Sequence, residues 1–275
     1  MSTDRCFGSD ARVALPLTGE RTVPGIPSEN YWFRRHEAAY EFVLRLLTDG
    51  TLVSAAPAQP LLDRRSRPVL AEIGAGEGYG AALLAEQAGT VLALDYDQAA
   101  IGHLARKYPR LRPLRANLAA LPFADGTIDV VVSLQVIEHV WNHPEFLAEC
   151  LRVLRPGGQL VLSTPNRLTF SPGLDLPTNP FHTHEFTATE LAALVGAGGF
   201  ETTSLLGLHA GSRLRALDVA HSASGGFVAA QLACPPDEWS PDLRAAVTSV
   251  STADFDISAA VIDSSLDLIV LARRP

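Results

Sequence analysis

Along most of this chain, short runs of apolar residues alternate with longer runs in which apolar residues recur every three or four positions. Short apolar runs, which predict buried strands, lie at about 69–73, 90–95, 111–116, 127–134, 158–164, 200–206 and 266–272. Amphipathic runs, which predict helices, lie at about 79–88, 97–107, 144–154 and 187–197. Strands that alternate with helices are typical of an α/β fold with helices on both faces of a parallel sheet. We therefore predict a doubly wound, mostly parallel sheet of seven strands, with a ligand at the carboxyl ends of the strands.

One more helix is predicted before this alternation begins. Between residues 28 and 50, apolar or aromatic side chains recur at steps of three and four residues, which gives the helix one packing face. That face comprises Trp32, His36, Tyr40, Val43 and Leu47. Ser28 is suited to cap the start of the helix, and Gly50 stands where a C-cap is expected.

The pattern divides the chain into two parts. Residues 1–67 are predicted to form an N-terminal loop and a lid helix, and residues 68–275 the ligand-binding domain. Two stretches, 166–186 and 208–265, interrupt the regular alternation. We interpret them as insertions on the side where a second substrate, the acceptor, binds. Long connections in a compact domain are usually functional.

The turn after the first strand carries the chemical signal. In "EIGAGEGYG" the glycines follow the pattern G-x-G-x-G, and Tyr79 stands where a dinucleotide fingerprint has its third glycine. Glu72 precedes this turn and would repel a pyrophosphate, whereas it suits a cationic amine such as that of S-adenosylmethionine (SAM). Asp95 ends the next strand and can accept hydrogen bonds from ribose hydroxyls. Lys107 is the only lysine and His103 stands four places before it, so the Tyr–Lys pair of short-chain reductases is absent.

The amino-acid composition narrows the remaining classes of function and partner. The net charge of −8 over 275 residues argues against nucleic acid as the main partner. Cys6, Cys150 and Cys234 form no C-x-x-C pair, so neither a disulfide framework nor a zinc knuckle is predicted. No apolar run has the length of a membrane span and no signal peptide is evident, so we expect a cytoplasmic protein without a membrane partner. The oligomeric state stays open.

Five motifs in order resemble the class I SAM-dependent methyltransferases. They are "EIGAGEGYG", "LALDYD", "ANLAALPFADGTIDVVVSLQVIEHV", "LRVLRPGGQLVLSTPN" and "ELAALVGAGGF", and they cover about 69–206. The resemblance implies a Rossmann-like fold, SAM as cofactor, and a set of cofactor-binding residues. This set is Glu72, Gly74, Ala75, Gly76, Gly78, Asp95, Tyr96, Asn117, Leu118 and Gln135. The family commonly has Asp where this chain has Asn117, by the adenine, and Gln135 is expected near the transferable methyl.

The ends of the chain resemble a narrower group, the mycobacterial methyltransferases linked to 6-O-methylglucose lipopolysaccharide assembly. The matching stretches are "GERTVPGIPSENYWFRRHEAAY", "STPNRLTFSPGLDLPTNPFHTHEF", "STADFDI" and "DSSLDLIVLARRP". This resemblance implies a glucan acceptor methylated on the 6-OH of glucose. The alternatives are an O-methyltransferase for small molecules of the quinone or polyketide kind, and a non-catalytic SAM-binding protein.

The stretch "QVIEHVWNH" supplies the candidate catalytic residues. Glu138 and His139 follow the fourth strand, so we expect them to face the methyl, with His139 as the base for the acceptor hydroxyl. His143 follows one helical turn later. An equally weighted interpretation makes Glu138 and His139 an orienting pair or a strand-end cap.

A third interpretation is a divalent metal. Some SAM methyltransferases bind a cation through an E-x-x-E-H run and a later histidine, although here Gln135 occupies the first position. His182 or His184 is then the distant ligand. If their segment is extended, both histidines face the same way.

Two further expectations concern substrate contacts. Arg34 or Arg35 is a candidate to bind the methionine carboxylate from the lid helix. The aromatic rings of Tyr31, Trp32 and Trp141 are candidates to stack on sugar faces.

Overall fold

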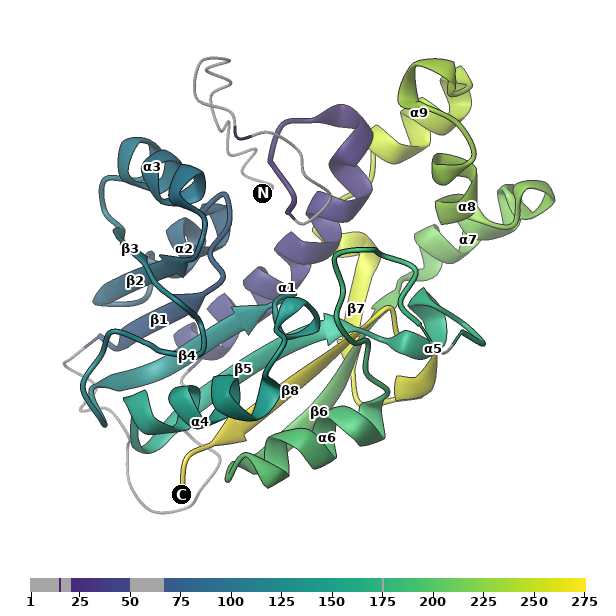
Figure 1. The fold of residues 1–275 in the computed structure, drawn as a ribbon. Helices are drawn as coiled ribbons and strands as arrows, with labels where there is room; N and C mark the ends of the chain where they lie inside the picture. The colour runs from purple at the N-terminus through teal and green to yellow at the C-terminus, as the bar shows by residue number, and fades with distance from the viewer. Residues whose placement is uncertain (1–14, 16–20, 50–66, 175) are drawn as a thin grey trace.

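A computed structural model describes residues 15, 21–49, 67–174 and 176–275, and Gly50 lies outside them. The described residues form a sheet of eight strands in the order β3-β2-β1-β4-β5-β8-β6-β7 (Figure 1). The strands are β1 Val69–Ile73, β2 Thr90–Asp95, β3 Arg112–Arg115, β4 Ile128–Leu134, β5 Leu154–Pro165, β6 Glu201–Ala210, β7 Phe255–Ser258 and β8 Asp267–Arg273. Strands β1 to β5 pair in parallel, whereas β8 runs antiparallel to β5 and β6.

The predicted α/β fold is confirmed, but the predicted number of seven strands is wrong. The extra strand is β7, which pairs antiparallel with the end of β6 from Gly207 to Ala210. It has only four residues and lies inside the stretch 208–265 that was interpreted as an insertion. Such a short strand has too few positions to establish a period of two, so its pairing with β6 decides its structure.

Nine α-helices accompany the sheet within the described ranges. They are α1 Asn30–Thr48, α2 Tyr79–Leu84, α3 Gln98–Lys107, α4 His143–Val153, α5 Arg167–Phe170, α6 Ala188–Ala197, α7 Ser212–Ala220, α8 Phe227–Leu232 and α9 Pro241–Thr248. No described helix is long and apolar enough to cross a membrane.

The helix starts show where local sequence decides structure. The prediction of Ser28 as a cap is wrong, because Pro27–Glu29 forms a 3-10 turn and α1 begins after Glu29 without a side-chain cap. Thr187, in contrast, caps α6 in a reciprocal capping box with Glu190.

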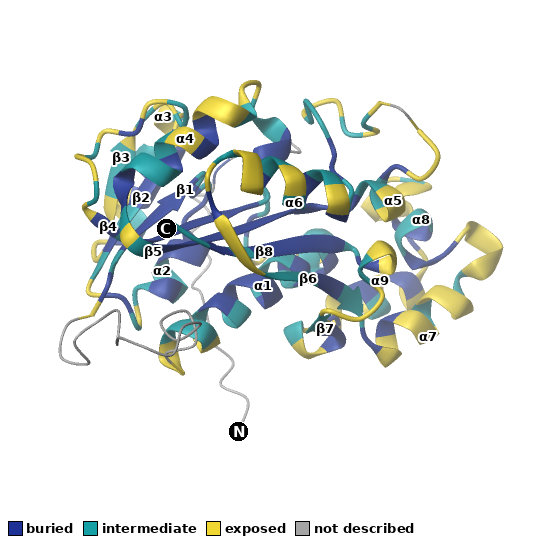
Figure 2. Cartoon of the chain, turned by 90° about the horizontal axis from the view of Figure 1, so that it is seen from below, coloured by how far each residue is buried: buried dark blue, intermediate teal, exposed yellow. Residues whose placement is uncertain are grey.

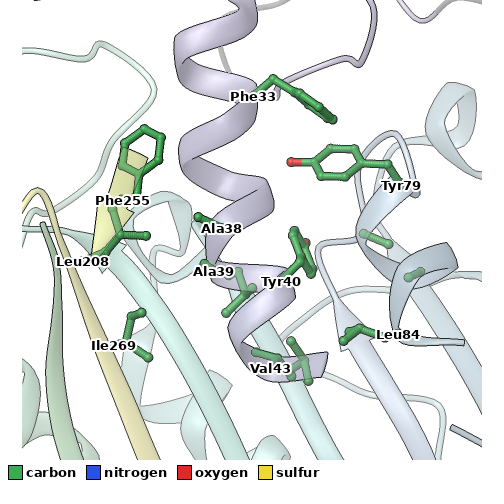
Figure 3. Packing of buried hydrophobic residues seen from close by; sticks show 14 of the residues in the cluster. Phe33, Ala38, Ala39, Tyr40, Val43, Tyr79, Leu84, Leu208, Phe255 and Ile269 are labelled. Atoms are coloured by element: carbon green, nitrogen blue, oxygen red, sulfur yellow. The ribbon is translucent and has the colours of Figure 1, made fainter. Parts of the chain in front are cut away.

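Helices cover both faces of the sheet, and each face has its own apolar core. One core joins the sheet to α1, α2 and the α7–α9 region, and the other joins it to α4 and α6. Figure 2 shows the buried strands between these two layers. In Figure 3, Tyr40 of α1 points toward α2, while Ala38 and Ala39 lie near Leu208 and Ile269 of the sheet.

This strand order creates the point at which a ligand is expected. The chain moves outward from β1 through β2 to β3, then returns to place β4 on the other side of β1. Crevices beyond the carboxyl ends of the strands at such a switch point bind ligands in open α/β sheets. The glycine turn that follows Ile73 lies at this edge.

Candidate active site

A pocket opens at the carboxyl ends of β1, β2 and β4. Its empty space, including the open solvent at its mouth, is about 850 Å³. Its lining comprises Arg21, Thr22, His36, Tyr40, Gly74, Ala75, Gly76, Glu77, Tyr79, Asp95, Tyr96, Leu118, Leu134, Gln135, Val136, His139 and Val140. Seven of the ten predicted cofactor-binding residues are in this lining.

The glycine turn is held close to β2. The backbone N–H groups of Gly74 and Ala75 both donate to the carbonyl of Leu94, each at 2.8 Å. Gly74 has a φ of +81°, and a Cβ there would lie 2.4 Å from Val136 Cγ2. A side chain is therefore excluded for two reasons, and the turn presents its backbone to the pocket.

Asp95 lies beside this turn with both carboxylate oxygens engaged. Oδ2 accepts from the backbone N–H of Gly76 at 2.8 Å, and Oδ1 accepts from Asp97 at 2.9 Å. Each oxygen retains a further lone pair, because a carboxylate accepts about four hydrogen bonds. The fixed carboxylate can thus accept from two neighbouring hydroxyls, as a ribose presents them.

Glu72 is fully buried and does not line the pocket. Tyr40, which does line it, donates to Glu72 Oε1 at 2.6 Å, and Oε2 has no hydrogen-bond partner in the described structure. Burial raises the pKa of the Glu72 carboxyl to about 8, although the Tyr40 hydrogen bond opposes this rise. An unpartnered carboxyl oxygen next to the glycine turn fits the expected SAM, whose amino group is cationic.

Two other predicted cofactor residues also lie outside the pocket lining. Gly78 has a φ of +94°, and a Cβ there would lie 2.1 Å from Leu104 Cδ2, so this glycine allows α3 to pack closely. Asn117 is exposed, and its Oδ1 accepts from the backbone N–H of Ala119 at 3.0 Å. Leu118 is the residue of this pair that reaches the pocket.

The structure contradicts the expectation that Arg35 binds the cofactor. Arg35 is buried and donates to both carboxylate oxygens of Asp267 on β8, with Nε to Oδ2 at 2.7 Å. Arg34 pairs with Glu37 one turn along α1. The arginine that lines the pocket is Arg21, which pairs with Asp97 at 2.8 Å.

Gln135 lies directly after β4 with a left-handed backbone, at a φ of +57°. This conformation is uncommon for a residue with a Cβ, and such strain is concentrated at functional sites. Its backbone N–H donates to the Ser163 carbonyl at 3.0 Å, and its Nε2 donates to Ser163 Oγ at 3.2 Å. These bonds from β5 hold Gln135 at the pocket wall.

His139 lies at the rim of the pocket, and Glu138 lies behind it. His139 Nδ1 is 3.0 Å from the Phe181 carbonyl, so Nδ1–H donates and Nε2 keeps its lone pair. Glu138 is buried and accepts from Thr164 Oγ1 at 2.9 Å. It is not among the lining residues, so it does not face the pocket as His139 does.

The histidine pair of the loop 166–186 separates, which contradicts the expectation that both face one way. The His182 ring lies 4.9 Å from the His139 ring, whereas His184 lies 6.2 Å from His143 and 4.6 Å from Phe186. The segment is irregular rather than extended, because Thr183 turns back to the Glu138 carbonyl. His143 donates to the Ile137 carbonyl and does not line the pocket.

The three candidate aromatic residues have different surroundings. Tyr31 is buried and Trp32 packs against it with ring centroids 5.1 Å apart, so these two rings anchor α1. Trp141 is 90% exposed, two residues after His139. Trp141 is therefore the ring of the three that is free to stack on a ligand.

Sequence reasoning assigned no cofactor or catalytic role to nine of the lining residues: Arg21, Thr22, His36, Tyr40, Glu77, Tyr79, Leu134, Val136 and Val140. The signal for two of them existed, since His36 and Tyr40 lie on the predicted packing face of α1. Burial lowers the pKa of His36 to about 4, so its ring is neutral at pH 7. Glu77 accepts from Tyr108 at 2.8 Å and pairs with Lys107, the only lysine. These contacts join distant segments and have no local pattern.

Comparisons with known proteins agree with this geometry. A family model described as a methyltransferase domain matches residues 71–162. A protein of Mycolicibacterium smegmatis named a probable S-adenosylmethionine-dependent methyltransferase is 47% identical over 265 residues, 95% of this chain and 96% of the relative. A protein of the same name from Mycobacterium tuberculosis is 48% identical over 267 residues, 95% of this chain and 90% of the relative.

A solved SAM-dependent methyltransferase from Thermotoga maritima shares the fold, with a TM-score of 0.54 and 16% identity. The match covers 89% of this chain and 93% of the Thermotoga chain. Because the identity is this low, the likeness supports the fold alone. The two mycobacterial relatives match nearly end to end. The chain therefore belongs to the SAM-dependent methyltransferases, and SAM is its cofactor.

Proposed function

We propose that this methyltransferase transfers a methyl group to a sugar hydroxyl, the 6-OH of glucose units in a methylglucose polysaccharide. The observation that carries the proposal is Trp141, 90% exposed and two residues from His139 at the pocket rim. An exposed indole offers an apolar face that suits the C–H face of a sugar ring, and here it stands beside a histidine able to accept a proton. The resemblance of the chain ends to methylglucose enzymes supplies the identity of the sugar.

The proposed cofactor site uses the pocket described above. SAM supplies an activated methyl group, so the protein mainly has to align it with the acceptor. The glycine turn approaches the amino acid part, Asp95 and Tyr96 the ribose, and Leu118 the adenine. Gln135, held by Ser163, lies toward the transferable methyl. Glu72 acts from beneath the pocket through its free carboxyl oxygen and its bond with Tyr40.

The proposed catalytic pair is Glu138 and His139. The Phe181 carbonyl fixes the His139 tautomer in which Nε2 carries the lone pair, as a base for a hydroxyl proton requires. Glu138 also holds this segment in place, since its backbone carbonyl accepts from the backbone N–H of Thr183, in the loop 166–186, at 2.6 Å. The loop 166–186 therefore positions His139, and we propose that it shapes the acceptor site.

The assay is transfer of labelled methyl from SAM to a panel of glucans, mannans and quinols. We expect glucans to be methylated, and His139→Ala to lower kcat by roughly 10²–10⁴ with SAM affinity retained. His143→Ala is the matched control, because His143 is a neighbouring histidine that does not line the pocket. Transfer to quinols but to no glucan would establish the small-molecule alternative instead. Absence of transfer to every acceptor, with SAM bound, would favour the non-catalytic alternative.

A further inference from the structure

Three side chains with metal-binding atoms converge at His139, which is the one of the three that lines the pocket. Glu138, His139 and His182 each offer one ligand atom, and these atoms all lie within 4.8 Å of one another. Glu138 and His139 come from the 3-10 turn Ile137–His139 after β4, and His182 comes from the loop 166–186. Thr183 joins the two segments, because its Oγ1 donates to the Val140 carbonyl at 2.7 Å.

Each of the three side chains also has an outer partner that orients it. His139 donates Nδ1–H to the Phe181 carbonyl, and Glu138 Oε2 accepts from Thr164. His182 Nδ1 lies 2.8 Å from Glu185 Oε1, so Nδ1–H donates to this carboxylate. Histidines that bind metals almost always donate their other N–H to a carboxylate or a backbone carbonyl. Both histidines show this arrangement.

The charge around the cluster favours a cation. Glu138 and Glu185 are 1% and 2% exposed, and Glu185 Oε2 has no hydrogen-bond partner among the described residues. In the same part of the chain neither carboxylate forms an ion pair with arginine or lysine; Glu185 pairs only with His182. Buried carboxylates without a compensating charge are costly, and a bound cation would offset that cost.

We propose that Glu138, His139 and His182 bind one divalent cation, with its remaining coordination positions open to acceptor oxygens. One carboxylate and two imidazoles suit Mn²⁺, Fe²⁺ or Zn²⁺ better than Ca²⁺, which prefers oxygen ligands alone. His182 Nε2 lies 3.1 Å from Asn179 Nδ2, and the cation replaces this hydrogen bond if it binds there. The proposal rests on the proposed function but changes the role of His139: a cation that uses the Nε2 lone pair leaves none for a proton, so the bound cation would acidify the sugar hydroxyl, which then loses its proton to solvent.

The test measures Mn²⁺ binding to the metal-free full chain by calorimetry, without SAM or acceptor. We expect one site in the wild type, weakened at least about tenfold by Glu138→Gln and by His182→Ala, since even outer partners of a ligand contribute about 10- to 100-fold. His184→Ala is the matched control, two residues along the same loop, and should bind as the wild type does. Circular dichroism verifies that each variant is folded.

A second measurement needs no variant. Spin-echo spectra of the Mn²⁺-loaded wild type should show coupling to imidazole nitrogen. Absence of binding at millimolar Mn²⁺ and Zn²⁺, or binding without this coupling, overturns the cation site. Glucan transfer that persists in a chelator overturns the cation's role but leaves the proposed function intact. Cation binding without any glucan transfer refutes the proposed function and leaves the site standing.

Discussion

Replacing Glu72 with glutamine should change the pH dependence of stability in a direction that the structure specifies. The Glu72 carboxyl is fully buried, and burial raises its pKa from the ordinary 4.5 to about 8. The folded chain therefore binds this proton more tightly than the unfolded chain does. Wild-type stability is consequently lost as the pH rises from about 4.5 toward 8, where the carboxyl must ionise in its buried position.

The magnitude follows from the two pKa values. A rise from 4.5 to about 8, at about 1.36 kcal/mol for each pH unit, corresponds to at most about 5 kcal/mol. Glu72→Gln has no proton to lose, and its amide oxygen can still accept from Tyr40. The variant should therefore gain stability relative to the wild type between pH 4.5 and 8 by up to this amount.

Urea unfolding at pH 4.5, 6.5 and 9 measures this difference, and the lowest pH serves as the internal reference. Calorimetry at pH 7, where the amine of SAM is cationic, should also show weaker SAM binding by the variant, because the free carboxyl oxygen opposite that amine is lost. A stability difference between variant and wild type that stays constant across this pH range would refute the burial argument. Unchanged SAM affinity would refute the role of Glu72 in the cofactor site.

Three further expectations follow from the geometry. Asp95→Ala should weaken SAM binding by about 1.5–3 kcal/mol, the contribution of hydrogen bonds to a charged group, as measured by calorimetry; unchanged affinity would displace the ribose from this site. Trp141→Ala should raise the KM for glucan several-fold with SAM affinity unchanged, whereas an equal loss of both would make Trp141 structural. Arg35→Met should destabilise the protein by about 3–5 kcal/mol in urea unfolding, because it leaves Asp267 buried without its partner; adding Asp267→Asn should restore part of that loss, and a double variant less stable than the single one would contradict this.

The parallel part of the fold could be predicted from sequence because its signals are local. The apolar runs of β1 and β2 match the predicted bounds to the residue, since short buried strands leave a continuous apolar signature. The capping box of Thr187 and Glu190 at the start of α6 is a local signal of the same kind, because it lies within four consecutive residues. Strand β7 was not predictable, because its structure depends on a pairing with β6.

The pocket was only partly predictable for the same reason. Gly74 and Asp95 lie directly after β1 and at the end of β2, so motif spacing alone locates them. The partners of Arg35 and His139 depend on how segments far apart in the sequence dock. Sequence reasoning therefore made Arg34 or Arg35 a candidate for the methionine carboxylate, whereas the structure pairs Arg35 with Asp267. It also left His182 and His184 equivalent, and the structure brings only His182 to His139.

The most direct test of the proposed glucose 6-O-methylation identifies the methylated atom. The wild-type chain is incubated with SAM carrying a ¹³C-labelled methyl group and an unmethylated glucose oligomer, and the product is analysed by two-dimensional NMR. If the 6-OH of glucose accepts the methyl group, one new class of methoxy signal appears, correlated through three bonds with C6 of glucose units. A label at another position, or a label transferred only to a non-carbohydrate acceptor, would contradict the proposal.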